Sequence, residues 1–170
     1  MENLDPAPSA SEFFDAAERF RKSFEPNTLS ARPARHIVVV TCMDARIDLF
    51  RLLGLDIGDA HILRNAGGRV TDDVVRSLVL SSHALGTREV VVIHHTGCGL
   101  FGATNDDLRN KVLEATGWTA DHIDFLPFRD VVASVQQDVE RVRECTLLPD
   151  DMTAWGCVYD VDDGSLTRVA

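Results

Sequence analysis

The chain has 170 residues, a formal net charge of −10 at pH 7 and a hydrophobic fraction of 45%. This length fits one domain that buries about two thirds of its unfolded surface. The negative charge argues against nucleic acid as a partner, and no apolar run approaches the ~18 residues of a membrane span. Residues 1–14 lack the basic start and apolar segment of a secretory signal, so we expect a cytoplasmic protein.

Residues 1–35 are expected to form an N-terminal tail and a helical arm. Ser9 followed by Glu12 resembles a capping box at the start of this helix. One face of the helix then carries Phe13, Ala17, Phe20 and Phe24. These aromatic rings must be buried, either in the chain's own core or against a second subunit, and the sequence leaves both alternatives open.

From residue 36 onward, short apolar runs alternate with helical segments. Three runs are expected to be strands: HIVVVT (36–41), AHILRN (60–65) and REVVVIH (88–94). Helical spacing marks the segments 47–54, which Gly54 should end, and 71–86, where Thr71 and two aspartates favour a helix start. Such strand–helix–strand repetition predicts a parallel sheet with right-handed crossovers.

The C-terminal third continues this pattern and ends in a hairpin. Residues Asn105–Asp107 should open a short helix, and Asp130 should cap a longer one whose inner face carries Val131, Val135, Val139 and Val142. Segments 153–161 and 165–169 are expected to form a terminal hairpin around a DDG turn. The sequence therefore predicts a single α/β domain over 36–170, with a parallel β-sheet core, flanking helices, an N-terminal helical arm and a C-terminal strand or hairpin.

Potential metal ligands follow two of the predicted strands. Cys42 comes directly after the first, and His95 and Cys98 come after the third. The carboxyl ends of parallel strands meet at one edge of a sheet, so these side chains should lie together. Two thiolates and an imidazole suit Zn²⁺, whose catalytic sites combine three protein ligands with water. The spacing alone is weak evidence, because a buried cysteine at a strand end often serves packing only.

Asp44 and Arg46 follow Cys42 in the same turn. Their spacing allows a charge-assisted pair that fixes the carboxylate beside the metal. A surface salt bridge is the alternative interpretation of this pair. Asp44 has two candidate roles: it can accept a hydrogen bond from metal-bound water, or it can itself be the fourth ligand.

Three motifs together resemble those of the β-class carbonic anhydrases, in particular the short bacterial or archaeal branch. They are CMDAR (42–46), RNAGG (64–68) and HHTGCG (94–99). The resemblance implies that Cys42, His95 and Cys98 bind Zn²⁺, and that Asp44 and Arg46 form a catalytic dyad with Asp44 as a conditional fourth ligand. It places Arg64 near the substrate pocket, where it contacts an anion or forms a salt bridge.

The function implied by the resemblance is that of a lyase, carbonate dehydratase. The enzyme would hydrate CO2 reversibly to bicarbonate and a proton by means of zinc-bound hydroxide, as a homodimer or higher homo-oligomer. One alternative is hydrolysis of carbonyl sulfide or carbon disulfide at the same zinc site. Another is a non-catalytic zinc-binding protein. His36, His61 and His94 are candidate proton shuttles, although structural roles are the simpler interpretation of each.

Overall fold

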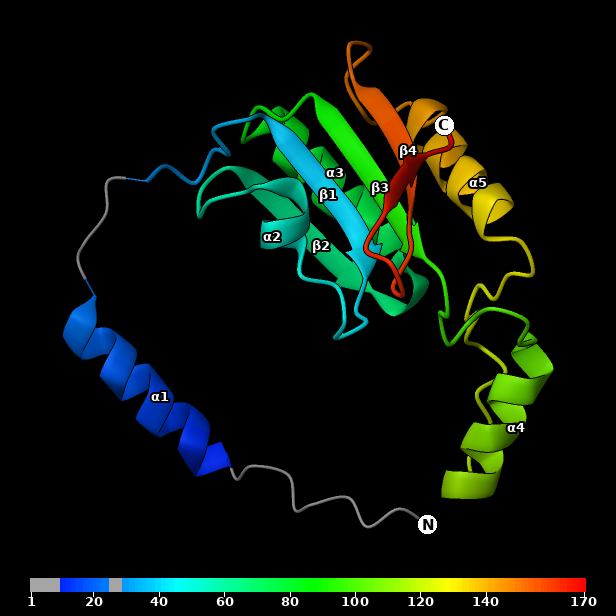
Figure 1. Ribbon diagram of the computed structural model, residues 1–170. Helices are drawn as coiled ribbons and strands as arrows, with labels where there is room; N and C mark the ends of the chain where they lie inside the picture. The colour runs from blue at the N-terminus through cyan, green and yellow to red at the C-terminus, as the bar shows by residue number, and fades with distance from the viewer. Residues whose placement is uncertain (1–9, 25–28) are drawn as a thin grey trace.

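The computed structural model describes residues 10–24 and 29–170. Its centre is a five-stranded sheet in the order β2-β1-β3-β4-β5 (Figure 1). The strands are β1 (Ile37–Cys42), β2 (Ala60–Asn65), β3 (Glu89–His95), β4 (Thr153–Tyr159) and β5 (Leu166–Arg168). The first four run parallel, and β5 pairs antiparallel with β4. The predicted α/β class, parallel core and C-terminal hairpin are confirmed.

The helices are α1 (Ala10–Ser23), α2 (Leu49–Leu53), α3 (Asp72–His83), α4 (Asn105–Thr116) and α5 (Val131–Arg143), with a short 3-10 turn, η1 (Ala66–Gly68), after β2. The predicted capping residues are confirmed: Thr71 accepts a hydrogen bond from Val74 N, and Asp130 accepts one from Ala133 N. α3 ends before the expected Gly86. Its last carbonyls bond the backbone N–H groups of Gly86 and Thr87, which turns the chain toward β3.

Hydrophobic side chains cover both faces of the sheet. On one face, Val38 and Val40 of β1 lie in a cluster with buried residues of α3 and α5. On the other face, Val39 and Cys42 lie with Ile93 and with Leu49 of α2. β1 is therefore buried on both sides, as its continuous β-branched run predicts for a central parallel strand.

Two helices stand away from this core. Figure 1 shows α1 and α4 projecting from the sheet on separate connections. Phe13 and Phe20 of α1 are 68% and 64% exposed, and α4 contains no buried residue. The aromatic face of α1 is thus not packed in the chain's own core, whereas Ser9 of the predicted capping box lies outside the described residues. No helix in ranges 10–24 and 29–170 is both long and apolar enough to cross a bilayer.

Candidate metal centre

The carboxyl ends of β1 and β3 bring three potential metal ligands together. Cys42 is the last residue of β1, and His95 is the last residue of the neighbouring β3, which extends one residue further than predicted because His95 still pairs with Tyr159 of β4. The ligand atoms of Cys42, His95 and Cys98 lie within 4.8 Å of one another. Ligands on a tetrahedral zinc ion lie about 3.5–3.8 Å apart, so only a small adjustment would be needed.

The ring of His95 is oriented for coordination through Nε2. Its Nδ1 lies 2.8 Å from the backbone carbonyl of Thr96, which can only accept, so Nδ1 carries the hydrogen. Nε2 is buried and has no hydrogen-bond partner among the residues that the structure describes. A backbone carbonyl behind one ring nitrogen and an unsatisfied nitrogen in front is the usual arrangement of a metal-ligating histidine. The donor set therefore fits a thiophilic divalent cation such as Zn²⁺.

The pKa values of the two neighbouring thiols shift in opposite directions. The hydrogen bond from Cys98 lowers the pKa of Cys42 to about 4 against the opposing effect of burial, and backbone N–H groups of Asp44 and Gly67 assist. The same interaction, together with burial, raises the pKa of Cys98. Burial lowers the pKa of His95, but the neighbouring Cys42 thiolate outweighs it and raises that pKa on balance. A metal ion that binds here must displace the proton of Cys98, and the raised pKa of His95 increases the competition between a proton and the metal at that ring.

Asp44 and Arg46 form the predicted charge-assisted pair at the edge of this group. Arg46 donates from Nε to Asp44 Oδ1 at 2.9 Å and from Nη2 to Oδ2 at 2.7 Å. The backbone N–H of Arg46 also donates to Oδ1, and its Nη2 reaches the carbonyl of Gly97. These hydrogen bonds from Arg46 hold the pKa of Asp44 well below its usual range. The carboxylate is therefore ionised and fixed in orientation.

The carboxylate of Asp44 faces the ligands without joining them. Its Oδ2 lies 3.8 Å from Nε2 of His95, while the metal-capable group found among the described residues contains no carboxylate. The side chain of Asp44 is 18% exposed and that of Arg46 is 53% exposed. Thus the pair spans the boundary between the buried ligands and solvent, which a simple surface salt bridge does not.

Arg64 supports the loop that carries this pair. Its guanidinium donates to the backbone carbonyls of Cys42, Asp44 and Ile47, at 2.9, 2.6 and 3.2 Å. In the described part of the chain, Arg64 has no carboxylate partner within salt-bridge distance. These hydrogen bonds indicate that Arg64 stabilises the conformation of the loop 42–47. The contact of Arg64 with an anion stays a prediction.

The other candidate histidines have protein partners. His36 contacts the carbonyl of Gly86, and His61 contacts Ser81 and the carbonyl of Ala31. His94 points away from the ligand group, as the alternation of a strand predicts. Its ring nitrogens contact Ser134 and the carbonyl of Gly68. These contacts favour structural roles for all three histidines.

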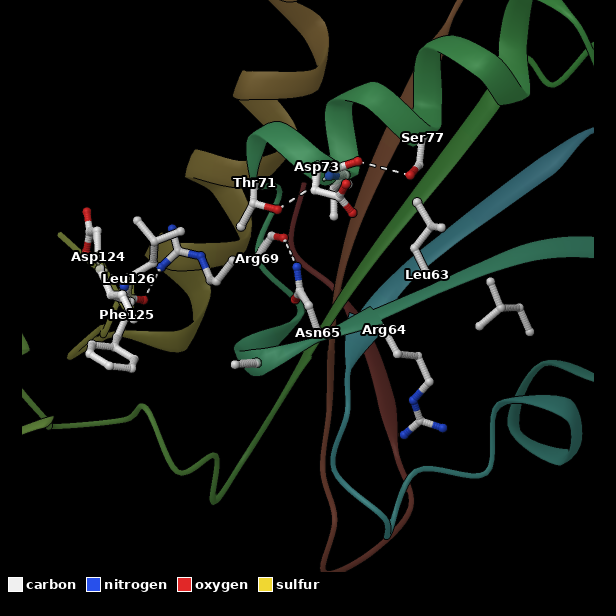
Figure 2. Close-up of a pocket in the computed structure, with 14 residues that line it drawn as sticks. Leu63, Arg64, Asn65, Arg69, Thr71, Asp73, Ser77, Asp124, Phe125 and Leu126 are labelled. Carbon is white, nitrogen blue, oxygen red and sulfur yellow. Dashed lines mark hydrogen bonds between the residues drawn. The ribbon is translucent and has the colours of Figure 1, made fainter. Parts of the chain in front are cut away.

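A pocket of about 450 Å³ is lined by residues of β2, the first turns of α3 and the segment 123–126, and none of the three potential ligands lines it. Figure 2 shows its polar wall, where Asn65 donates to the carbonyl of Arg69, and its apolar wall, which includes Phe125. Sequence reasoning missed this cavity, because residues 119–129 carry no periodic pattern. It also missed the turn at Gly67–Gly68, although the RNAGG motif contains both of these glycines.

These observations define an α/β protein with a group of three potential metal ligands at the carboxyl edge of a parallel sheet. A family model described as carbonic anhydrase matches residues 37–166. β-Carbonic anhydrase 1 of Mycobacterium tuberculosis is 40% identical over 141 residues, which cover 81% of this chain and 83% of that protein. The chain therefore belongs to the β-carbonic anhydrase family, as the three motifs predicted.

Two further similarities bear on function. The crystal structure of a carbonic anhydrase from Streptococcus mutans superimposes with a TM-score of 0.91 at 41% identity, covering 98% of this chain and 100% of that one. A carbon disulfide hydrolase of Acidithiobacillus thiooxidans is 34% identical over 152 residues, covering 78% of this chain and 76% of that protein. The family thus includes proteins named for two different substrates.

Proposed function

We propose that this chain is a zinc-dependent carbonic anhydrase that catalyses the reversible hydration of CO2 to bicarbonate and a proton. The observation that carries the proposal is the buried Cys42–His95–Cys98 group with an ionised carboxylate beside it and outside it. Three ligands leave a fourth position for water, as in catalytic zinc sites. Relatives named as carbonic anhydrases at 40% and 41% identity support the choice of substrate.

Bound zinc would lower the pKa of a coordinated water and so make it a nucleophile near neutral pH, an effect for which carbonic anhydrase is itself the standard example. The protein's part is to supply two thiolates and one neutral imidazole, whose two negative charges would balance those of a divalent zinc ion. Backbone N–H groups of Asp44 and Gly67 hydrogen-bond to the Cys42 sulfur. These hydrogen bonds draw charge from the thiolate, which reduces its donation toward a metal.

Asp44 is the group that would orient the attacking water. Arg46 keeps Asp44 ionised, so the carboxylate can accept a hydrogen bond from a water in the fourth position. This hydrogen bond would orient the water so that one of its oxygen lone pairs is directed at the substrate. Arg46 also anchors the pair to the carbonyl of Gly97, next to the ligand Cys98. The same anchoring opposes a permanent Asp44–metal bond, so it argues against a purely structural zinc site.

Carbon disulfide hydrolysis is the second candidate, because relatives at 34% identity bear that name. The metal group alone does not distinguish the two reactions, since both substrates are small, linear and apolar. Access to the site would decide between them.

We further propose that the protein works as a homo-oligomer, a dimer at the least. The exposed aromatic face of α1 is the support: Phe13, Phe14 and Phe20 are each more than 60% exposed in the isolated chain. Rings of this size are seldom left in water in such a cluster. A second copy of the chain would bury them.

The deciding experiment combines metal analysis with stopped-flow assays on the purified protein. We expect about one zinc ion per chain and rapid CO2 hydration, with slow sulfide release from carbon disulfide. Fast sulfide release with negligible CO2 hydration would replace the first proposal by the second. A zinc-loaded protein that is inactive toward both substrates at every pH would indicate a structural site.

A further inference from the structure

A buried cluster of charged and polar side chains lies behind the metal centre, on the opposite side of β3 from His95. It consists of Arg69, His94, Ser134 and Asp138, with exposed fractions of 7%, 0%, 1% and 3%. Burying charged groups is unfavourable unless they are paired and fully hydrogen-bonded. The proposed reaction does not use any of these residues, so their presence requires another explanation.

Asp138 is the centre of the cluster. Arg69 donates to it from Nε at 2.7 Å and from Nη2 at 3.4 Å. Nη1 of Arg69 donates to the carbonyl of Leu126 at 2.8 Å, and Figure 2 shows these two residues. Burial raises the pKa of Asp138, but hydrogen bonds from His94 and Arg69 outweigh burial and lower it. The carboxylate is thus a charged acceptor shared between two donors.

His94 connects Asp138 to the turn after β2. Its Nε2 lies 3.2 Å from Asp138 Oδ2 and 3.2 Å from the carbonyl of Gly68. Because both of these atoms accept, Nε2 must carry the hydrogen. Its Nδ1 lies 2.7 Å from Oγ of Ser134, on α5. The ring of His94 is therefore held from both sides, with one nitrogen directed at the turn.

The Gly67–Gly68 turn packs directly against the backbone of Cys42, a proposed metal ligand. Gly68 has a φ of +69°, and a Cβ atom there would lie 2.8 Å from the backbone N of Cys42 and 2.9 Å from the carbonyl carbon of Thr41. Gly67, one residue earlier, donates its N–H to the Cys42 sulfur. The cluster is thus connected to the turn in two ways. His94 contacts the carbonyl of Gly68, and Arg69, a member of the cluster, directly follows Gly68 in the chain.

We propose that Asp138 is a positioning residue for the metal centre, which acts through His94, Arg69 and the Gly67–Gly68 turn on Cys42. This inference rests on the proposed function for the metal itself. Asp138 holds the side chains of Arg69 and His94 in place, and these hold the turn. The turn then positions the backbone N–H that donates a hydrogen bond to the Cys42 sulfur. Residues that orient metal ligands in this way commonly contribute ten- to hundredfold to metal affinity.

The test is Asp138→Asn, measured by zinc affinity and by the spectrum of the cobalt-substituted protein. The amide keeps the volume of the carboxylate but turns one acceptor into a donor, which must face either Arg69 or His94. We expect at least tenfold weaker zinc binding in a chelator competition. We also expect a shift of the thiolate-to-cobalt charge-transfer band, because the hydrogen bond to the Cys42 sulfur is altered.

Val142→Ala is the matched control. Val142 lies on the same helix, is 2% exposed and belongs to the apolar cluster of the core. This variant should lower the thermal midpoint, while zinc affinity stays within twofold of wild type and the cobalt band does not move. Ser134→Ala is the milder second variant, which removes the partner of His94 Nδ1 and should weaken zinc binding about threefold.

The inference is overturned if Asp138→Asn binds zinc within twofold of wild type with an unchanged cobalt band, or if Val142→Ala loses as much affinity. Should Asp138→Asn fail to fold, Ser134→Ala decides: an unchanged affinity and spectrum then overturn it. Wild-type protein that binds zinc without hydrating CO2 would refute the proposed function alone, because affinity and cobalt spectrum remain measurable. Active wild type with an unaffected Asp138→Asn would refute the inference alone.

Discussion

The carboxyl edge of the sheet and the two projecting helices differ in how far their characteristic side chains are buried within the chain. At the sheet edge, Cys42, His95 and Cys98 are at most 7% exposed, and they come together from segments that lie far apart in the sequence. On α1 the large aromatic side chains remain in solvent. The difference teaches that the metal group is complete within one chain, whereas the apolar surface is not.

The first way to break this comparison is to remove a ligand. Cys42→Ser should weaken zinc binding by more than about a thousandfold and abolish CO2 hydration, because a hydroxyl is a far poorer zinc ligand than a thiolate. Metal content after dialysis measures the effect. Cys145→Ser and Cys157→Ser are the controls, since neither residue belongs to the metal-capable group. Full zinc content in Cys42→Ser would contradict the assignment.

The second way acts on the exposed side of the comparison. Replacing Phe13 and Phe20 together by Ser should raise the dissociation constant of an oligomer about a hundredfold or more, because each buried Phe contributes about 1.5–3 kcal/mol. Analytical ultracentrifugation over a concentration series measures this. Leu147→Ser provides a control, since that side chain is 62% exposed and lies outside α1. A wild-type protein that is monomeric at every concentration would refute the proposed oligomer.

A pH series sharpens the account of the metal group. The pKa of Cys98 is raised strongly in the metal-free site, so this thiol holds a proton that zinc must displace, and the raised pKa of His95 favours its protonated form. Cys42, with a pKa of about 4, is already ionised and contributes no pH dependence there. Zinc affinity should therefore rise with pH, by about tenfold per unit for each displaced proton between pH 6 and 8. Chelator competition at several pH values measures it, and a flat profile would contradict it.

The smallest of these effects concerns the pair at the boundary between ligands and solvent. Arg46→Ala removes the donors that fix Asp44 but no proposed metal ligand, so kcat/KM for CO2 should fall about ten- to hundredfold with zinc retained. The control is Arg51→Ala, whose side chain is 90% exposed and pairs only weakly with Asp48. Unchanged kcat/KM in Arg46→Ala would mean that Asp44 needs no positioning.

The sheet and the grouping of the potential ligands were predictable because they depend on patterns that can be read along the sequence. Continuous β-branched runs indicated central parallel strands, and strand ends in a parallel sheet must converge, so Cys42 and His95 could be paired from sequence alone. The Asp44–Arg46 pair was predictable for the same reason, since two positions in one turn can meet. The predicted start of the helix 131–143 at Asp130 held because a capping residue acts locally.

The buried cluster around Asp138 was not predictable. Asp138 sits on a helix among polar neighbours, and Arg69 follows a glycine turn, so each looks like an ordinary surface residue in the sequence. Their meeting depends on how α5 crosses β3, which no local pattern encodes. Similarly, the donation of Arg64 to three carbonyls depends on the path of the loop 42–47, so the sequence could only place Arg64 near the pocket.

The pairing of β1 with β3 has a consequence for how the protein matures. Two of the three proposed ligands, His95 and Cys98, are near neighbours along the chain, but Cys42 reaches them only when the two strands align, with Thr41 beside Ile93. Tight zinc uptake during refolding should therefore lag behind helix formation and report the moment at which the central strands dock. A nascent chain with the proposed zinc site would hold the ion only loosely until then, because the third ligand is still missing.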